Sequence, residues 1–244
     1  MPGSKPTPRR RIKRSIVRSL FGFLCKSAIA FGLVSILLAL PVRWLPPITS
    51  SFMVQSALFG SGGLRPYSYQ WQSYDKIAPS LALAAIAAED QRFPDHKGFD
   101  LQELQDALEE GKAGEGLRGA STISQQVAKN LYLWSGRNFV RKGLEAWFTV
   151  LIEWLWSKQR ILEMYLNVAQ FGDRVFGAEA ASQRFLSINA NQLSQEESAL
   201  LAAVLPGPEI YFVDRPSSTV LSRQSWILQQ MYQLGGTEYL RKIQ

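Results

Sequence analysis

The chain has 244 residues, 46% of them hydrophobic, which is enough for one sizeable core but not for two full domains. Its formal net charge of +7 is concentrated at one end: residues 1–50 hold nine Lys or Arg and no acid, whereas the rest holds 18 basic and 20 acidic residues. The folded body is therefore close to neutral, which argues against a nucleic-acid-binding surface, and the basic excess is typical of a tail beside a membrane.

A single transmembrane helix is predicted over residues 19–42, behind a basic tail of residues 1–18. The run SLFGFLCKSAIAFGLVSILLALPV contains one charge, Lys26, near the end where its ammonium group can reach the interface. Seven Lys or Arg precede this run and no acid occurs before Asp75, so the tail is expected in the cytoplasm and the body outside. A cleaved signal peptide is the alternative, although the run is long for one and LALPVRW is a poor cleavage site.

The remaining chain divides into a stalk and a helical domain. Residues 43–69 are rich in Pro, Gly, Ser and aromatic residues and predict an irregular stalk or lead-in. No alternating strand pattern of any strength follows, so residues 70–244 are expected to form a mainly α domain. Because the only cysteine, Cys25, lies in the anchor, this domain should fold without disulfides or cysteine metal sites.

Helical patterns fill most of the chain from Pro79 onward. Pro79 suits the first turn of a helix over SLALAAIAAED, and Gly111 is placed to stop an amphipathic helix over LQELQDALEEG. A glycine-rich loop, KAGEGLRGA, comes next. Capping-box spacing then occurs twice, at Thr122 with Gln125 and at Ser194 with Glu197, and further helices are predicted over 139–156, 158–171, 175–186 and 193–205. The run AWFTVLIEWLW is too short to cross a bilayer and is expected in the core, with part of it near lipid.

Glu89 and Asp90 end an almost wholly apolar helix. The negative end of the helix dipole and the apolar surroundings both disfavour an ionised carboxylate, so a raised pKa is expected, as a general acid or base requires. The alternative is structural: Asp90 pairs with a nearby base or caps the turn ahead of Pro94, and Glu89 is merely exposed.

His96 is the only histidine of the chain. Without a second His or any Cys in the domain it cannot form a zinc-type site, and the sequence has no Gly-x-Ser-x-Gly motif that would recruit it to a catalytic triad. Its position between Asp95 and a glycine turn favours a role in fixing the loop by hydrogen bonds.

Two segments predict an anion-binding surface. GASTISQQVAKN offers free backbone N–H groups at a helix N-terminus, with Gln125, Gln126 and Lys129 on one face of that helix. GRNFVRKGLEAW adds a cluster of cations that suits a diphosphate. Taken alone, the first segment favours an ordinary capped surface helix, and Arg141 and Glu145 of the second could form a plain surface ion pair. The residues concerned are Ser121, Thr122, Gln125, Gln126, Lys129, Arg137, Arg141, Lys142 and Glu145.

Taken together, five blocks of sequence resemble the glycosyltransferase 51 family, the peptidoglycan glycosyltransferases, and most closely its monofunctional biosynthetic members. The blocks are EDQRFPDHKG at 89–98, GASTISQQVAKN at 119–130, RKGLE at 141–145, KQRILEMYLN at 158–167 and FGAEAASQRF at 176–185. The second block departs from the family pattern at Ala120 and Ser124. No Lys-Thr-Gly motif of a transpeptidase occurs, so no transpeptidase activity is expected.

The resemblance implies a lysozyme-like, mainly helical catalytic domain over 70–244 and assigns roles within it. Glu89 would be the general base and Glu145 the second essential carboxylate, while Asp90, Phe93, His96 and Gly98 would support the base. The other eight residues of the anion-binding set would bind the substrate: Ser121, Thr122, Gln125, Gln126, Lys129, Arg137, Arg141 and Lys142. No cofactor is required, although family analogy admits a divalent cation, Mg²⁺ or Mn²⁺, near the diphosphate.

The implied reaction is the polymerisation of lipid II into β-1,4 glycan strands with inversion and release of undecaprenyl diphosphate. The partners would be lipid II, the growing glycan, the bacterial inner membrane and other cell-wall synthesis or division proteins, with the catalytic domain in the periplasm. Two alternatives stay open on the sequence: a lysozyme-like hydrolase or lytic transglycosylase, which would need no cationic diphosphate site, and an inactive membrane-anchored scaffold.

Overall fold

The computed structural model describes residues 8–60, 63–112, 121–136 and 138–244. It divides into two compact units, Met1–Trp44 and Leu45–Gln244. The first contains helix α1 (Pro8–Ala39) and a short 3-10 turn, η1 (Pro41–Arg43), at the proline that ends the α-helix. Leu20–Arg43 is long and apolar enough to cross a membrane, and its part within α1 spans about 30 Å, the thickness of a bilayer core. The predicted anchor is therefore present as a membrane-spanning candidate.

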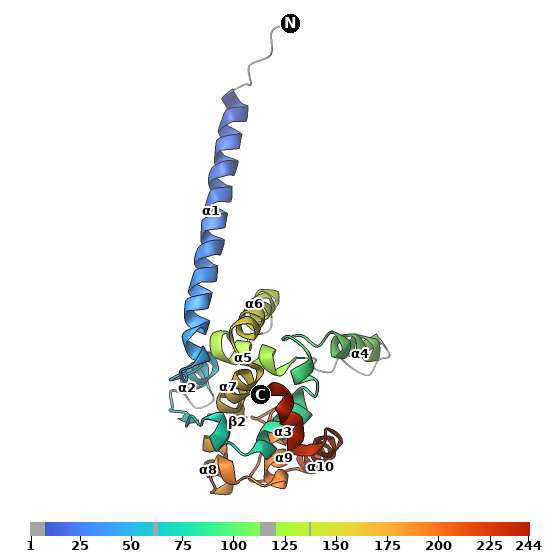
Figure 1. Cartoon of the computed structure of the whole chain (residues 1–244). Helices are drawn as coiled ribbons and strands as arrows, with labels where there is room; N and C mark the ends of the chain where they lie inside the picture. The colour runs from blue at the N-terminus through green and yellow to red at the C-terminus, as the bar shows by residue number, and fades with distance from the viewer. Residues whose placement is uncertain (1–7, 61–62, 113–120, 137) are drawn as a thin grey trace. The chain divides into compact units, whose positions relative to one another are not determined.

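The second unit is mainly helical, as predicted (Figure 1). Its α-helices are α2 (Ser51–Phe59), α3 (Pro79–Glu89), α4 (Leu101–Lys112), α5 (Ile123–Tyr132), α6 (Phe139–Leu155), α7 (Lys158–Val168), α8 (Ala178–Leu186), α9 (Gln195–Val204) and α10 (Ser218–Gln233). Short 3-10 helices are η2 (Tyr74–Lys76), η3 (Phe93–Asp95), η4 (Ala190–Gln192) and η5 (Gly236–Ile243). Pro79 lies in the first turn of α3, and both predicted capping boxes are formed. The α4 helix runs past Gly111 by one residue, and the glycine-rich loop after it lies outside the described residues.

Helix α3 forms the centre of the core. Every side chain from Ser80 to Ala87 is buried, because α3 packs against α7, α9, α10 and η5. Its alanines are matched by Ala199, Ala202 and Ala203 on α9, which are also fully buried. Small side chains on both helices allow close packing, and a helix that is apolar on all sides is stable only inside a core. The end of α3 is consequently fixed with respect to the helices around it.

Two features differ from the sequence-based expectation. The predicted irregular lead-in contains α2, whose N-cap Ser50 accepts a hydrogen bond from Met53 N–H, and Gln55 of α2 donates to the carbonyl of Leu133 after α5. A small sheet also forms, with strand order β1-β3-β2. Its strands are β1 (Ser68–Tyr69), parallel to β3 (Val175–Phe176), and β2 (Gln170–Gly172), antiparallel to β3. Strands of two or three residues are too short to show an alternating pattern in the sequence.

Gly177, between β3 and α8, has a backbone conformation that only glycine adopts readily. Its φ is +86° and its ψ 154°, and a Cβ atom there would lie 2.7 Å from the carbonyl oxygen of Asn167. Asn167 itself bonds Gln72 through both of its side-chain polar atoms and cannot move without breaking these contacts. The glycine therefore allows α7 and α8 to approach closely.

We expect Gly177→Ala to lower the free energy of unfolding by at least about 1–3 kcal/mol, because it adds backbone strain and a clash. Gly143→Ala is the matched control: Gly143 lies in helix α6, and a Cβ atom added there would meet nothing within 4 Å, so this variant should gain about 0.5–1 kcal/mol. Thermal and urea unfolding of the detergent-solubilised chain measure both. Equal stabilities of the two variants would contradict the assignment.

Candidate active site

Glu89 is the last residue of α3, and its side chain is largely enclosed, with 13% of its surface exposed. Each carboxylate oxygen has one donor: Gln126 Nε2 of α5 donates to Oε2 at 2.8 Å, and Arg223 Nη2 of α10 lies 3.3 Å from Oε1. The carboxylate is thus held between two helices that are far from α3 in sequence.

Burial raises the pKa of Glu89 above its ordinary value, and the charge of Asp90 adds to this effect. The hydrogen bond from Gln126 and the positive charges of Arg223 and Lys129 oppose it but do not cancel it. The raised pKa expected from the sequence is confirmed, with desolvation as its main cause. A carboxylate of this kind is a stronger base than an exposed one.

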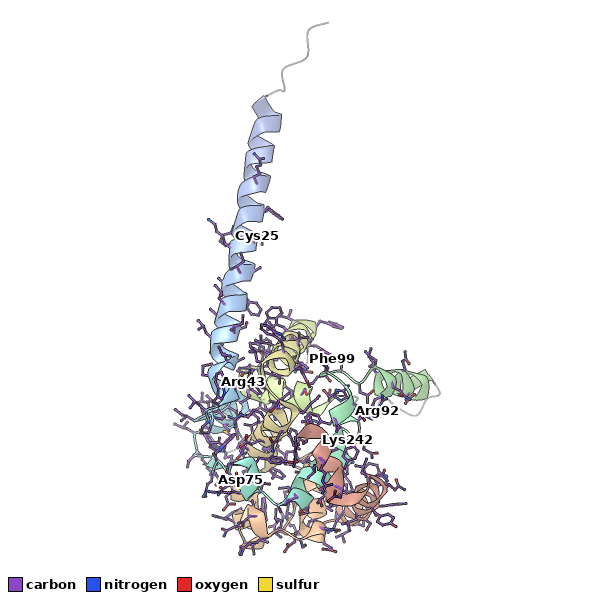
Figure 2. All side chains as sticks on the ribbon, in the orientation of Figure 1. Cys25, Arg43, Asp75, Arg92, Phe99 and Lys242 are labelled. Carbon is purple, nitrogen blue, oxygen red and sulfur yellow. The ribbon has the colours of Figure 1, made fainter. Side chains whose placement is uncertain are left out.

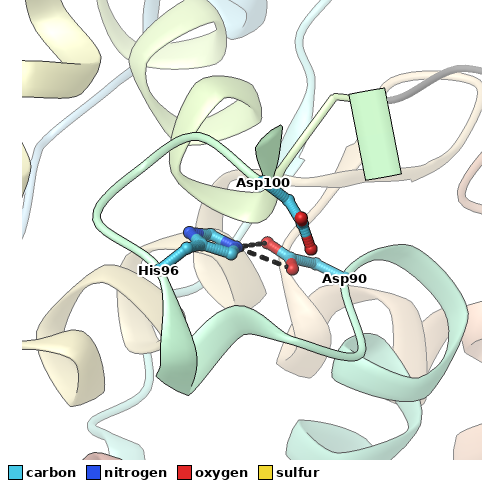
Figure 3. Close-up of side chains that lie close together, drawn as sticks. All are labelled: Asp90, His96 and Asp100. Carbon is cyan, nitrogen blue, oxygen red and sulfur yellow. Dashed lines mark hydrogen bonds and ion pairs between the residues drawn. The ribbon is translucent and has the colours of Figure 1, made fainter. Parts of the chain in front are cut away.

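Asp90 belongs to a hydrogen-bonded frame rather than to the open site (Figure 3). His96 Nδ1 accepts from the N–H of Gly98 at 3.2 Å, so its proton lies on Nε2, which donates to Asp90 Oδ1 at 2.9 Å. Asp90 Oδ2 accepts from Ile123 N–H at 3.0 Å, and the Thr122 hydroxyl donates to the carbonyl of Gly98. The frame ties the loop after α3 to the first turn of α5, which carries Gln126.

The same loop brings Asp90, His96 and Asp100 close together, with one ligand atom of each within 4.8 Å of the others (Figure 3). Both oxygens of Asp90 already accept N–H groups, and Asp100 Oδ1 accepts the backbone N–H groups of Gln102 and Glu103 at the start of α4. This is the one such group in the part of the chain that the structure describes. Because these oxygens already accept hydrogen bonds, Asp90, His96 and Asp100 suit a hydrogen-bonded frame better than a metal site.

Phe93 supports this loop from the core side. Its ring is fully buried, and Lys158 Nζ lies 4.4 Å from the ring centroid. Lys158 also pairs with Glu153 at 2.7 Å, and Glu153 accepts the hydroxyl of Ser124. The Ser124 hydroxyl is therefore bound to a carboxylate within the protein.

The second predicted carboxylate, Glu145 on α6, is buried and fully paired. Arg141 Nη1 lies 2.6 Å from its Oε2, and Lys142 Nζ bonds its Oε1. The pair of Arg141 and Glu145 is thus not a surface pair. Among the described residues, the Nε–H of Arg141 has no hydrogen-bond partner, although it is buried. A buried donor of this kind is available to a ligand with oxygen acceptors.

Lys129 of α5 interacts electrostatically with both Glu89 and Glu145. Burial and the charges of Arg141 and Lys142 lower its pKa, whereas Glu145 and Glu89 raise it, and the net shift is downward. Its ammonium group also lies 5.4 Å from the ring centroid of Phe52 on α2. Lys129 is therefore a partly desolvated cation with no short ion pair of its own among the described residues.

A cavity of about 350 Å³ lies beside these groups. Its lining includes Gln126 and Lys129 of α5, Tyr165 and Gln170, and the segment 205–210 after α9. Gln126 thus contacts both the Glu89 carboxylate and the cavity. The size is that of a small-ligand pocket, and the lining combines aromatic, amide and cationic groups.

Comparison with known proteins identifies the family. A family model described as Transglycosylase matches residues 58–232. The chain belongs to the transglycosylase family. It is 52% identical over 242 residues to a biosynthetic peptidoglycan transglycosylase of Xanthomonas euvesicatoria, with 98% of this chain and 96% of that protein covered. It is 48% identical to one of Pseudomonas aeruginosa, covering 94% and 100%, and 47% identical to one of Pseudomonas fluorescens, covering 93% and 96%.

Membership confirms the resemblance found in the five blocks, and the chain is a glycosyltransferase with a lysozyme-like helical domain behind one N-terminal apolar helix.

The blocks of this transglycosylase have different tasks in the structure. Gln126 and Lys129 face the cavity and Ser121 lies beside Gln126, whereas Thr122 and Gln125 are buried in the capping box of α5. The expectation that Gln125 shares a face with Gln126 and Lys129 is wrong, because its side chain bonds back to Thr122 N–H. Arg137 lies outside the described residues.

Sequence analysis missed three parts of the transglycosylase site: Tyr165, the segment 205–210 and Arg223. Tyr165 is fully buried, and burial together with the charge of Glu89 raises its pKa well above the ordinary value. Arg223 is the single charged residue in the sequence of α10, and a lone charge in a helix of this length is the one signal that could have pointed to it.

We expect His96→Ala to lower the free energy of unfolding by about 1–3 kcal/mol, because it leaves the buried Asp90 carboxylate without one of its donors. Lys97→Ala, at the exposed neighbouring position, should change it little. Urea unfolding followed by circular dichroism compares the two. A loss shared by both variants would mean that the loop, not the Asp90 contact, is responsible.

Proposed function

We propose that this transglycosylase polymerises lipid II into β-1,4 glycan strands and releases undecaprenyl diphosphate, with inversion at the anomeric carbon. The names of the Xanthomonas and Pseudomonas relatives, biosynthetic peptidoglycan transglycosylases, support the substrate class. The observation that carries the proposal is the arrangement at Gln126 and Lys129: an enclosed carboxylate of raised pKa lies on one side, and a cationic cluster, in which Lys129 and Arg141 are partly enclosed, lies on the other.

In this mechanism Glu89 accepts the proton of the acceptor 4-hydroxyl while that oxygen attacks the anomeric carbon of the growing chain. The bond from that carbon to the diphosphate oxygen breaks in the same displacement, and the diphosphate leaves with its charge. Each Glu89 oxygen uses one acceptor site for Gln126 or Arg223, and carboxylate oxygens have a further site each. A positioned general base of this kind contributes about 10²- to 10⁴-fold.

Lys129, Arg141 and Lys142 would neutralise the departing diphosphate. Glu145 fixes Arg141 and Lys142 by two short contacts, so these cations need little reorganisation when charge develops. The unpartnered Nε–H of Arg141 supports an oxygen-rich ligand here. A glycan-cleaving reaction would need no such cluster, and this favours synthesis.

A divalent cation is not needed for the steps above. Glu145, the carboxylate that contacts the cluster, is committed to two cations. Any Mg²⁺ or Mn²⁺ would therefore be held mainly by the diphosphate itself, and would supply additional charge neutralisation there.

We infer that the anchor lies in the bacterial inner membrane, with the basic N-terminus in the cytoplasm and the catalytic unit outside. The α6 helix supports contact with lipid. Its inner face, including Phe148 and Ile152, is buried, as predicted for this run, whereas Val150 and Trp154 are exposed, Trp154 by 74%. Exposed tryptophan on an apolar helix face is typical of the membrane interface.

We expect Glu89→Gln to reduce polymerisation of labelled lipid II by about 10²-fold or more, because an amide cannot accept the hydroxyl proton. Glu196→Gln, at an exposed glutamate at the start of α9, is the matched control and should keep full activity. Glycan product is measured on gels with the full chain in detergent, and thermal unfolding checks that the variant is folded. No polymer from the unchanged protein, or full activity of Glu89→Gln, would refute the proposal.

The single cysteine allows a direct test of the α6 surface. Cys25 lies on α1 (Figure 2), and a Cys25→Ser background leaves no other thiol. A polarity-sensitive fluorophore on Trp154→Cys should shift its emission to the blue when the protein is reconstituted into vesicles. The same label on Ser225→Cys, exposed on α10, should not shift. Identical emission at both positions would argue against α6 as a lipid-facing helix.

A further inference from the structure

Helix α10 packs against α3, although none of the five sequence blocks lies in α10. It also packs against α9, and its only charged residue is Arg223. One nitrogen of this side chain, Nη2, lies 3.2 Å from the carbonyl oxygen of Ala88 and 3.3 Å from Oε1 of Glu89. The guanidinium carbon also lies 5.9 Å from the ring centroid of Trp226, one turn further along α10. The guanidinium is therefore fixed at three points beside the carboxylate.

Arg223 and Gln126 each bind a different oxygen of the Glu89 carboxylate. Gln126 binds Oε2 from α5, and Arg223 binds Oε1 from α10. Donors on both oxygens, from two different helices, restrict rotation of the carboxylate about its terminal bond. A general base works best in one orientation with its free acceptor sites toward the substrate.

We propose that Arg223 is a positioning residue for Glu89, which orients the carboxylate and keeps it ionised within its enclosed site. This inference rests on the proposed role of Glu89 as general base. It assigns to α10, which carries none of the family blocks, a part in the reaction.

The other charged and titratable groups that face Glu89 cannot take over this role. Lys129 of α5 lies in the cavity lining, and by the proposed function the diphosphate neutralises it when substrate is bound. Asp90 has the same charge as Glu89 and disfavours its ionisation. Tyr165 of α7 stays neutral at working pH, since its pKa is raised well above the ordinary value. Arg223 lies outside the cavity lining and keeps its charge throughout the cycle.

The sign of the pH effect follows from this arrangement. The positive charge of Arg223 favours the ionised carboxylate and so lowers the pKa of Glu89 against the larger effect of burial. Removing that charge would raise the pKa further. At acidic pH a larger fraction of Glu89 would then carry a proton and be unable to act as base, whereas at alkaline pH the carboxylate would be ionised in both proteins.

The test is the pH profile of lipid II polymerisation by the full chain in detergent, for the unchanged protein, Arg223→Gln and Arg223→Lys. We expect the acidic limb of Arg223→Gln to move to higher pH, with about a tenfold loss on the acidic side and a much smaller loss on the alkaline side. Arg223→Lys keeps the charge and should retain the limb near its original position. Gln224→Ala is the matched control, since it removes only a hydrogen bond from α10 to the carbonyl of Glu196 and should leave the profile unchanged.

A loss by the same factor at every pH, or an unchanged profile for Arg223→Gln, would overturn the inference and leave Arg223 a structural residue of α10. If Arg223→Gln does not fold, Arg223→Lys decides: a limb displaced to higher pH despite the retained charge would overturn it. The Glu89→Gln variant distinguishes failure of the proposed function from failure of the role of Arg223. An active Glu89→Gln refutes the proposed function itself, whereas an inactive Glu89→Gln with an unmoved Arg223→Gln limb refutes only the role of Arg223.

Discussion

The site depends on one costly feature, a carboxylate at the end of a buried apolar helix. The core position of α3 leaves Glu89 little water, and a desolvated carboxylate is stable only with donors on its oxygens. Those donors come from α5 and α10, so α3, α5 and α10 must meet at one point. The close packing of α3 with α9 and α10, and the frame that ties the loop after α3 to α5, are the structural means of bringing them together.

Three buried or nearly buried carboxylates have different tasks because they have different partners. Asp90, adjacent to Glu89, accepts N–H groups from His96 and Ile123 and serves as a structural acceptor in the loop after α3. Glu145 is bound by two cations and holds them in place. Glu89 has one amide and one longer guanidinium contact, and burial raises its pKa. The charge and the distance of the partners, rather than their number or the residue type, separate the base from the framework.

The parts of this picture that the sequence could predict are those written in local patterns. Glu89 at the end of an apolar run, the two capping boxes and the anchor depend on neighbours within one turn or one helix. Gln125 was assigned to the face of Gln126 and Lys129, although its capping-box spacing with Thr122 already indicated a side chain that bonds back to Thr122 N–H. Arg223 was missed because its contact joins residues 134 positions apart, and no pattern in α10 indicates its partner. Helix α2 was missed because composition alone suggested a stalk.

The exposure of Arg223 explains how one carboxylate can satisfy two opposing demands. A general base gains strength from a raised pKa, but it must also be ionised before each turnover, and burial alone favours its protonated form. A fully buried ion pair would hold the carboxylate ionised and make it a poor proton acceptor. Arg223 is 31% exposed, and its contact of 3.3 Å is longer than that of Gln126, so water screens its charge. Burial and the screened charge of Arg223 therefore act in opposite directions on the pKa of Glu89. Together they keep the carboxylate ionised before turnover, while its proton affinity stays high enough to accept the proton of the acceptor hydroxyl.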